Sequence, residues 1–222
     1  MTSTANKRET TVIPDEGTSN VDPATRLYPP EYEGHLGSLL ISHEEIDSRV
    51  QELAQCIHED YKGTRPVMLC TLKGACPFYQ HLLDALQDLK QGYTMEFLRA
   101  SSYVGAATSG NVTLLGSELN KEDLENRHVI LVEDIVDTGT TLANLLPLLQ
   151  KFELKSLEVC TMLEKRLGDD KTPAAKAKYA GFSIPNKFVL GFGLDYNELY
   201  RDLKDIWVIS QAGIDFDAKS LV

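Results

Sequence analysis

The apolar residues of this chain form short continuous runs, and the stretches between them carry apolar residues at helical spacing. Short aliphatic runs with polar flanks are typical of strands that are buried on both faces. The pattern predicts strands at residues 39–41, 67–72, 93–99, 112–115, 129–132, 157–163, 179–182, 187–192 and 206–210. Strands that alternate with helices imply a parallel sheet with right-handed crossovers. The sequence therefore predicts an α/β fold.

Three helices are expected between these strands. Ser42 precedes Glu45 by three residues, which is a capping box, and apolar residues then follow on one helical face. Pro77 suits the first turn of a second helix, because a proline there removes no helical hydrogen bond. A third helix is predicted to start at Leu142, and Pro147 within it should bend it.

The composition suits one domain. The chain has 222 residues, of which 42% are apolar, and this is enough for a sizeable core. Residues 1–24 are rich in Thr, Ser, Asp and Glu, so we expect them to be disordered and residues 25–222 to form the domain. The formal net charge of −11 argues against nucleic acid as a partner and against a basic membrane anchor.

The location of the protein is predicted from what the sequence lacks. No apolar run approaches the roughly 20 residues that a membrane-spanning helix needs, and the polar start does not resemble a signal peptide. The four cysteines form no C-x-x-C pair, which indicates ordinary thiols in a reducing compartment. We therefore expect a soluble, cytoplasmic protein without a membrane partner.

Candidate chemistry is densest at residues 129–142, which read VILVEDIVDTGTTL. Glu133 and Asp134 follow a predicted buried strand, and open α/β sheets bind ligands at the carboxyl ends of their strands. Asp137 opens an Asp-Thr-Gly-Thr-Thr turn whose hydroxyls and backbone N–H groups enter a helix and can hold an anion. Gly139 lets the backbone approach that anion. The stretch predicts a phosphate-bearing ligand, with the carboxylates on sugar hydroxyls or on a metal.

Ordinary structural roles and two common motifs are the alternatives to this prediction. The stretch could be an ordinary strand, turn and capped helix, but three carboxylates at a strand end pack poorly. It is neither a Walker A loop, since no Gly-Lys-Ser/Thr follows, nor a dinucleotide loop, since G-x-G-x-x-G is missing. Lys73-Gly74 at the end of a predicted strand is only a weak indication of phosphate binding. Taken singly, Lys165 is interpreted as a solvated lysine and Phe188 as an aromatic residue of the core.

The order of these motifs resembles a known family. The sequence aliphatics–Glu–Asp–two aliphatics–Asp–Thr–Gly–x–Thr resembles the phosphoribosyl diphosphate (PRPP) motif of type I phosphoribosyltransferases. Further segments, in the same order across about residues 37–213, resemble hypoxanthine-guanine phosphoribosyltransferases. These are Leu72-Lys73-Gly74, Ser102-Tyr103, Lys165-Arg166, and residues 187–191, 194–198 and 201–203.

The resemblance implies a fold, a reaction and partners. The fold would be a mainly parallel central sheet flanked by helices, with its core at about residues 37–186. A small hood would come from residues 25–36 and 187–222, and a flexible lid loop from about residues 101–110. The reaction would join hypoxanthine or guanine to PRPP, giving IMP or GMP and pyrophosphate, with Mg²⁺ as cofactor. The protein would be a homodimer or homotetramer in purine salvage.

The resemblance also implies roles for individual residues. Asp137 would act as general base on the purine, and Lys165 would donate to its 6-oxo group. Glu133 and Asp134 would accept hydrogen bonds from the ribose hydroxyls and lie near Mg²⁺. Asp195 would hold Mg²⁺ together with pyrophosphate. The remaining substrate-binding residues would hold the 5′-phosphate (Thr138, Gly139, Thr140, Thr141), the base (Phe188, Val189), the pyrophosphate (Lys73, Gly74, Arg201) and the closed lid (Ser102, Tyr103). The peptide between residues 72 and 73 can be cis in this family.

The sequence departs from the family pattern at two places and leaves two other functions open. Residues 75–77 read Ala-Cys-Pro where a second glycine and an aromatic are expected, and residues 104–108 are less polar than expected for the lid. A catalytically silent relative that binds PRPP or nucleotide should lack the general base or the pyrophosphate ligands, and both are present here. A shifted preference toward xanthine is the other alternative.

Overall fold

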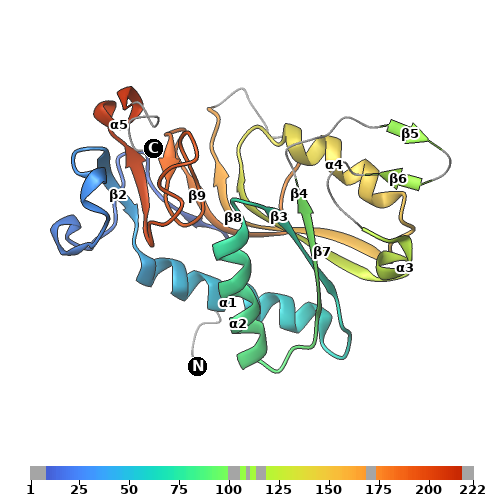
Figure 1. Ribbon diagram of the computed structural model, residues 1–222. Helices are drawn as coiled ribbons and strands as arrows, with labels where there is room; N and C mark the ends of the chain where they lie inside the picture. Colours follow the sequence, from blue (N-terminus) through green and yellow to red (C-terminus); the bar gives the residue numbers. More distant parts are fainter. Residues whose placement is uncertain (1–8, 100–105, 109–110, 114–118, 169–173, 217–222) are drawn as a thin grey trace, which may run out of the picture.

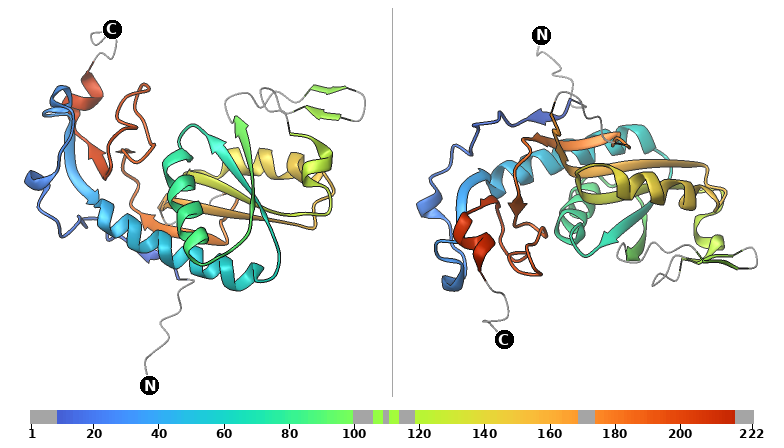
Figure 2. Two further views of the ribbon diagram at one scale, coloured as in Figure 1. Left: turned by 60° about the horizontal axis from the view of Figure 1, so that its bottom comes forward. Right: turned by 90° about the horizontal axis from the view of Figure 1, so that it is seen from above.

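The structure, a computed structural model, describes residues 9–99, 106–108, 111–113, 119–168 and 174–216. A central sheet carries helices on both faces, and a smaller sheet stands to one side of it (Figure 1). Both ends of the described chain contribute to this smaller unit, which the two further views of Figure 2 also show. No helix in the described ranges is long and apolar enough to cross a membrane.

The central sheet has six strands, and every neighbouring pair in it is parallel. In spatial order the strands are β1 (Thr11–Val12), β9 (Tyr179–Ile184), β8 (Ser156–Lys165), β7 (His128–Val136), β3 (Val67–Leu72) and β4 (Thr94–Arg99). The prediction of a mainly parallel α/β sheet is confirmed. Because all six strands run the same way, their carboxyl ends meet at one edge, where the motif residues lie.

Three longer helices cover the sheet, two on one face and one on the other. Helices α1 (His43–Tyr61) and α2 (Cys76–Asp88) pack on the face that receives Met68, Cys70, Ile130 and Val132. Helix α4 (Thr140–Gln150) packs on the face of Val67, Leu69, Val129 and Leu131, and the short α3 (Lys121–Leu124) adds its Leu124 there. Each fully buried aliphatic side chain contributes about 1.5–3 kcal/mol. The alternation of side chains along β3 and β7 therefore fixes the two strands between two cores.

The smaller sheet and its surroundings form a hood beside the central sheet, and this hood includes residues 37–41, which the prediction assigns to the core. Its strands are antiparallel in the order β10 (Val189–Leu190), β11 (Ile206–Ile209) and β2 (Leu36–Ile41). A third cluster of buried side chains, which includes Tyr32, Tyr200 and Trp207, fills it. The short helices η1 (Pro23–Thr25), η2 (Pro30–Tyr32) and α5 (Gln211–Asp215) complete it.

The capping box of α1 is present as predicted. The Glu45 backbone N–H donates to Ser42 Oγ at 3.3 Å, and the Ser42 backbone N–H donates to Glu45 Oε2 at 2.8 Å. Several element boundaries differ from prediction, among them the start of α4 and the end of β10. Helix α4 begins at Thr140 and not at Leu142, and Pro147 lies inside it. Strand β10 ends at Leu190, because residues 191–193 all adopt positive φ.

Strand β7 is also longer than predicted, and this places two site residues within it. The apolar run predicts a strand that ends at Val132, but β7 continues to Val136 because it stays paired with β8 up to Glu164. Glu133 and Asp134 are therefore residues of the strand itself. The parallel pairing with β8 holds their backbone, whereas the pairing with β3 ends at Val132, so the carboxylates are set on a strand and not on a loop.

The expected disorder of residues 1–24 is wrong for the part that the structure describes. Thr11–Val12 forms β1, which pairs with Phe182 and Ser183 of β9 at the edge of the sheet. Two arginines hold this segment: Arg49 Nη2 donates to the Glu9 carbonyl oxygen at 2.7 Å, and Arg166 Nη2 donates to the Ile13 carbonyl oxygen at 2.6 Å. A polar composition did not reveal these backbone contacts, which depend on distant residues.

Between β4 and α3 the structure describes only a two-stranded hairpin, β5 (Ala106–Thr108) with β6 (Asn111–Thr113). The predicted lid residues Ser102 and Tyr103 lie outside the described residues.

Candidate active site

The turn after β7 has the geometry of an anion site. Gly139 is the N-cap residue of α4 and has a φ of +73°, in the left-handed region that favours glycine. A Cβ at this position would lie 2.7 Å from the Ala175 backbone nitrogen, so the turn also needs a residue without a side chain. Thr138 Oγ1 and Thr140 Oγ1 are 2.9 Å apart at the helix start. The first-turn N–H groups of a helix lack intrahelical acceptors and attract a phosphate.

Glu133 is a buried carboxyl group with one unused oxygen. Its side chain is on β7, and the residue is only 7% exposed. Thr71 Oγ1 donates to Glu133 Oε2 at 2.7 Å, whereas Oε1 is buried without a hydrogen-bond partner. Burial raises the pKa of Glu133 to about 8, and the hydrogen bond from Thr71 only partly opposes this. A ligand that donates a hydrogen bond to Oε1 would stabilise the ionised form.

Asp134 lies beside Glu133 and faces the end of β3. Its Oδ1 accepts a hydrogen bond from the Ile135 backbone N–H at 2.8 Å, and burial raises the pKa of Asp134 above its ordinary value. The backbone of Gly74 passes so close to this carboxylate that a Cβ there would overlap it. Gly74 is therefore required at this position by the packing around the Asp134 carboxylate.

The loop between the hood strands β10 and β11 supplies the opposite wall. Arg201 Nη2 is 2.8 Å from Asp195 Oδ1, and Arg201 Nη1 donates to the Gly193 carbonyl oxygen at 2.7 Å. Lys73 Nζ is 2.8 Å from Glu198 Oε2, and Glu198 Oε1 lies 3.4 Å from Arg201 Nη2. The Leu72–Lys73 peptide is cis, as the resemblance implies.

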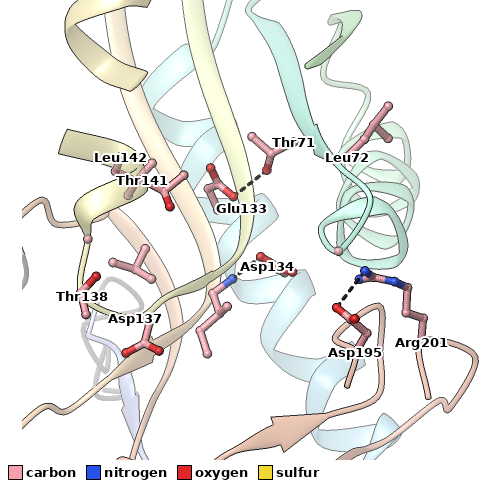
Figure 3. Close-up of a pocket in the computed structure, with 14 residues that line it drawn as sticks. Thr71, Leu72, Glu133, Asp134, Asp137, Thr138, Thr141, Leu142, Asp195 and Arg201 are labelled. Carbon is pink, nitrogen blue, oxygen red and sulfur yellow. Dashed lines mark hydrogen bonds and ion pairs between the residues drawn. The ribbon is translucent and has the colours of Figure 1, made fainter. Parts of the chain in front are cut away.

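One cavity unites most of these groups. Its volume is about 350 Å³. In Figure 3, Glu133 and Asp134 reach from β7 toward the end of β3, and the Asp195–Arg201 pair faces them across the cavity. Of the predicted substrate-binding residues, those that line it are Gly74, Glu133, Asp134, Asp137, Thr138, Gly139, Thr141, Asp195 and Arg201. Lys73 and Thr140 are next to the lining in sequence but do not belong to it.

The residues predicted to bind the base do not line this cavity. Lys165, the last residue of β8, places Nζ 2.9 Å from Asp137 Oδ2. The Asp137 side chain is 50% exposed and that of Lys165 only 10%. Phe188 exposes half of its surface and meets Tyr196 edge to face at 5.3 Å, while Val189 is buried in β10. An exposed aromatic ring suits stacking on a flat heterocycle.

The carboxylate oxygens around the cavity are suitable ligands for Mg²⁺. Mg²⁺ is usually held by one or two carboxylates together with substrate phosphates and water. Asp195 offers a partly exposed carboxylate, and Glu133 offers an unpartnered buried oxygen. Among the described residues no group of three or more His, Cys, Asp or Glu side chains could hold a metal by itself. Any metal bound here would need substrate oxygens.

Sequence reasoning missed three contributors to the site. Thr71 fixes Glu133, and its signal was a polar residue inside the apolar strand β3. Glu198 joins Lys73 to Arg201, and it lies in a segment that was recognised without assigning it a contact. Gly193 approaches the Gly74 carbonyl oxygen so closely that a Cβ there would overlap it, a contact that only the folded loops reveal.

Comparisons with known proteins agree with this geometry. The family model for the phosphoribosyl transferase domain matches residues 40–197. The chain is 36% identical over 191 residues to the hypoxanthine-guanine phosphoribosyltransferase of Cricetulus griseus, covering 83% of this chain and 86% of that protein. It is 36% identical over 179 residues to that of Streptococcus pneumoniae, covering 81% of this chain and 96% of that protein.

A solved structure extends the agreement to the fold. The crystal structure of hypoxanthine-guanine phosphoribosyltransferase from Schistosoma mansoni in complex with IMP matches with a TM-score of 0.76 at 27% identity. The match covers 94% of this chain and 100% of that one, so it includes the hood as well as the central sheet. The chain belongs to the hypoxanthine-guanine phosphoribosyltransferase family.

Proposed function

We propose that this protein transfers the phosphoribosyl group of PRPP to hypoxanthine or guanine in purine salvage, releasing pyrophosphate and IMP or GMP. The observation that carries the proposal is the single cavity in which an anion-binding helix start, the Glu133 and Asp134 carboxylates and the Asp195–Arg201 pair converge. These groups match the three parts of PRPP: its 5′-phosphate, its ribose hydroxyls and its pyrophosphate.

Charge development in this reaction explains the choice of residues. Cleavage of the C1′–oxygen bond leaves positive character on the ribose and negative charge on pyrophosphate, so preorganised charges serve it better than a nucleophile. Lys73 and Arg201 would hold pyrophosphate, and both are already positioned by Glu198. Glu133 and Asp134 would accept hydrogen bonds from the ribose hydroxyls. The 5′-phosphate would lie on the Thr138–Thr141 turn.

A separate group of residues would recognise the purine base. Lys165 would donate to the purine 6-oxo group, Phe188 would stack on the ring, and Asp137 would take the N7 proton. In the structure, Lys165 and Asp137 form an ion pair. The Asp137 side chain is half exposed, so solvent can replace Lys165 as its partner when a bound base separates the pair. The relative from Schistosoma mansoni is in complex with IMP.

Mg²⁺ is the cofactor that we propose, held by Asp195 and by the carboxylates of Glu133 and Asp134 together with substrate oxygens. When bound, it would neutralise charge on the leaving pyrophosphate. From the family resemblance we also propose a homodimer or homotetramer that acts in the cytoplasm.

A steady-state assay with PRPP, Mg²⁺ and each of hypoxanthine, guanine, xanthine and adenine tests the proposal. Turnover with hypoxanthine and guanine, and not with adenine, is the expected result, because Lys165 donates and therefore needs a 6-oxo acceptor. Turnover with xanthine would widen the substrate range without changing the reaction. PRPP or nucleotide binding without turnover of any base would overturn the proposal in favour of a silent relative.

A further inference from the structure

A second hollow lies at the edge of the central sheet opposite the candidate active site. Its volume is about 470 Å³. Its lining comes from the starts of β3, β4, β7 and β8 and from the turns before them, and consists of Thr64, Arg65, Thr94, Asn126, Arg127, His128 and Lys155. The candidate active site uses the carboxyl ends of β3, β7 and β8, so the two hollows lie at opposite ends of the same parallel strands.

The two hollows have opposite charge. The candidate active site is lined by four carboxylates, Glu133, Asp134, Asp137 and Asp195, against a single arginine. The second hollow is lined by Arg65, Arg127 and Lys155 together with His128, and contains no carboxylate. Such a concentration of positive charge stands out in a chain whose net charge is −11. Like charges that gather without a counter-charge repel one another, and a bound anion relieves that repulsion.

Hydrogen bonds to neighbouring residues hold the Arg127 guanidinium group in place. Arg127 Nη2 donates to the Arg65 carbonyl oxygen at 3.1 Å and to Thr94 Oγ1 at 3.0 Å. The Arg65 guanidinium lies over Gly92, where its Nε would be 3.1 Å from a Cβ, so glycine leaves room for it. Preorganised guanidinium groups bind phosphate oxygens in a fixed fork and lose little entropy when they do so.

Nearby carboxylates do not neutralise the hollow. Asp60 and Glu158 belong to an adjacent cluster, where they pair with Lys178 at 3.3 Å and 3.5 Å. Neither Arg65 nor Lys155 forms an ion pair with any residue that the structure describes. The pKa of His128 is lowered by burial and by Lys155, which agrees with a positive field in the hollow.

We propose that this hollow is a second anion site, which binds the phosphate chain of a di- or triphosphate without a metal ion. Its volume is within the range of about 300–1,000 Å³ of small-molecule sites. Guanidinium groups, an ammonium group, the Thr94 hydroxyl and an amide provide hydrogen-bond donors for several phosphate oxygens, whereas the Thr64 hydroxyl already donates to the Tyr61 carbonyl oxygen. The phosphate chain could be inorganic or part of a nucleotide, and both have the same chemistry here.

Isothermal titration of the full chain with inorganic tripolyphosphate, in EDTA and at low salt, tests the proposal. EDTA removes the divalent ions that the candidate active site is expected to use for pyrophosphate. The double variant Arg65→Gln/Lys155→Gln should weaken binding at this site about tenfold or more, because it removes two charge contacts. Both residues are exposed, so the fold should be retained. Arg127 is left in place because its hydrogen bonds join neighbouring turns.

Two further measurements locate the binding site and identify the class of its ligand. Arg201→Gln changes the candidate active site and should leave this binding unchanged. A nucleoside triphosphate that binds as tightly as tripolyphosphate would indicate that the phosphate chain alone is recognised, and tighter binding would assign the ligand to nucleotides. Absence of tripolyphosphate binding would overturn the proposal. The proposal would also be overturned if the double variant still bound tripolyphosphate and the Arg201→Gln variant did not.

Discussion

Replacing Glu133 with glutamine should remove a large part of the pH dependence of this protein's stability. In the folded protein the carboxyl group is buried, accepts one hydrogen bond from Thr71 and has an oxygen with no hydrogen-bond partner in the protein. Glutamine has nearly the same shape, keeps an acceptor for Thr71 and cannot ionise. The variant therefore isolates the free energy that a buried negative charge costs the protein at this position.

The size and sign of the effect follow from the pKa of Glu133. Burial raises that pKa from 4.5 to about 8 in the folded protein. The folded state thus favours the neutral carboxyl group. The stability that this preference contributes is fully present below pH 4.5 and is lost as the pH rises through about 8. At 1.36 kcal/mol for each pH unit between the two values, the loss amounts to roughly 3–6 kcal/mol.

Urea unfolding at pH 5.5 and pH 8.5 measures this loss. The wild-type protein should lose several kcal/mol more unfolding free energy between these pH values than Glu133→Gln does. Glu31→Gln, a substitution at an exposed carboxylate of the hood, is the matched control and should follow the wild type. Equal pH dependence in the wild type and Glu133→Gln would refute the reasoning, because Glu133 would then be ionised without cost.

Three further substitutions test separate parts of the site. Gly74→Ala should raise KM for PRPP by about tenfold or more, because a Cβ there overlaps the Asp134 carboxylate and overpacking costs about 1–3 kcal/mol; an unchanged KM would show that the loop adapts. Lys165→Gln should raise KM for hypoxanthine and guanine by roughly 10–150-fold, since it removes a charged hydrogen bond of about 1.5–3 kcal/mol, and equal effects on PRPP would contradict this role. Phe188→Ala should raise KM for the base by roughly 5–150-fold, as expected for the loss of base stacking of about 1–3 kcal/mol, and should leave KM for PRPP unchanged.

Much of the fold follows from the sequence because its signals are local. The capping residues Ser42 and Glu45 start α1 where expected, and the aliphatic runs at β3 and β7 form the buried parallel strands. The predictions fail where pairing between strands that are distant in sequence decides the structure. Strand β7 continues past its carboxylates because β8 pairs with it, and β1 exists because an exposed edge of β9 accepts it.

The candidate site divides in the same way. A motif within one stretch of chain identified Glu133, Asp134 and the phosphate turn, and the structure places them in one cavity. Contacts between distant segments were not predictable. Thr71 on β3 holds Glu133, and Glu198 connects Lys73 with Arg201 across loops that are far apart in sequence. Periodicity carries no information on such side-chain pairs.

The measurement that tests the central claim most directly is the turnover of Asp137→Asn with PRPP, Mg²⁺ and hypoxanthine. If Asp137 takes the purine proton, kcat should fall by about 10²–10⁴-fold, the usual contribution of a general base. PRPP should still bind with Mg²⁺ at close to wild-type affinity, because the phosphate turn and the Glu133 and Asp134 carboxylates are unchanged. Near-normal kcat in this variant would contradict the assignment of Asp137 as general base, and loss of PRPP binding would give it a structural role instead.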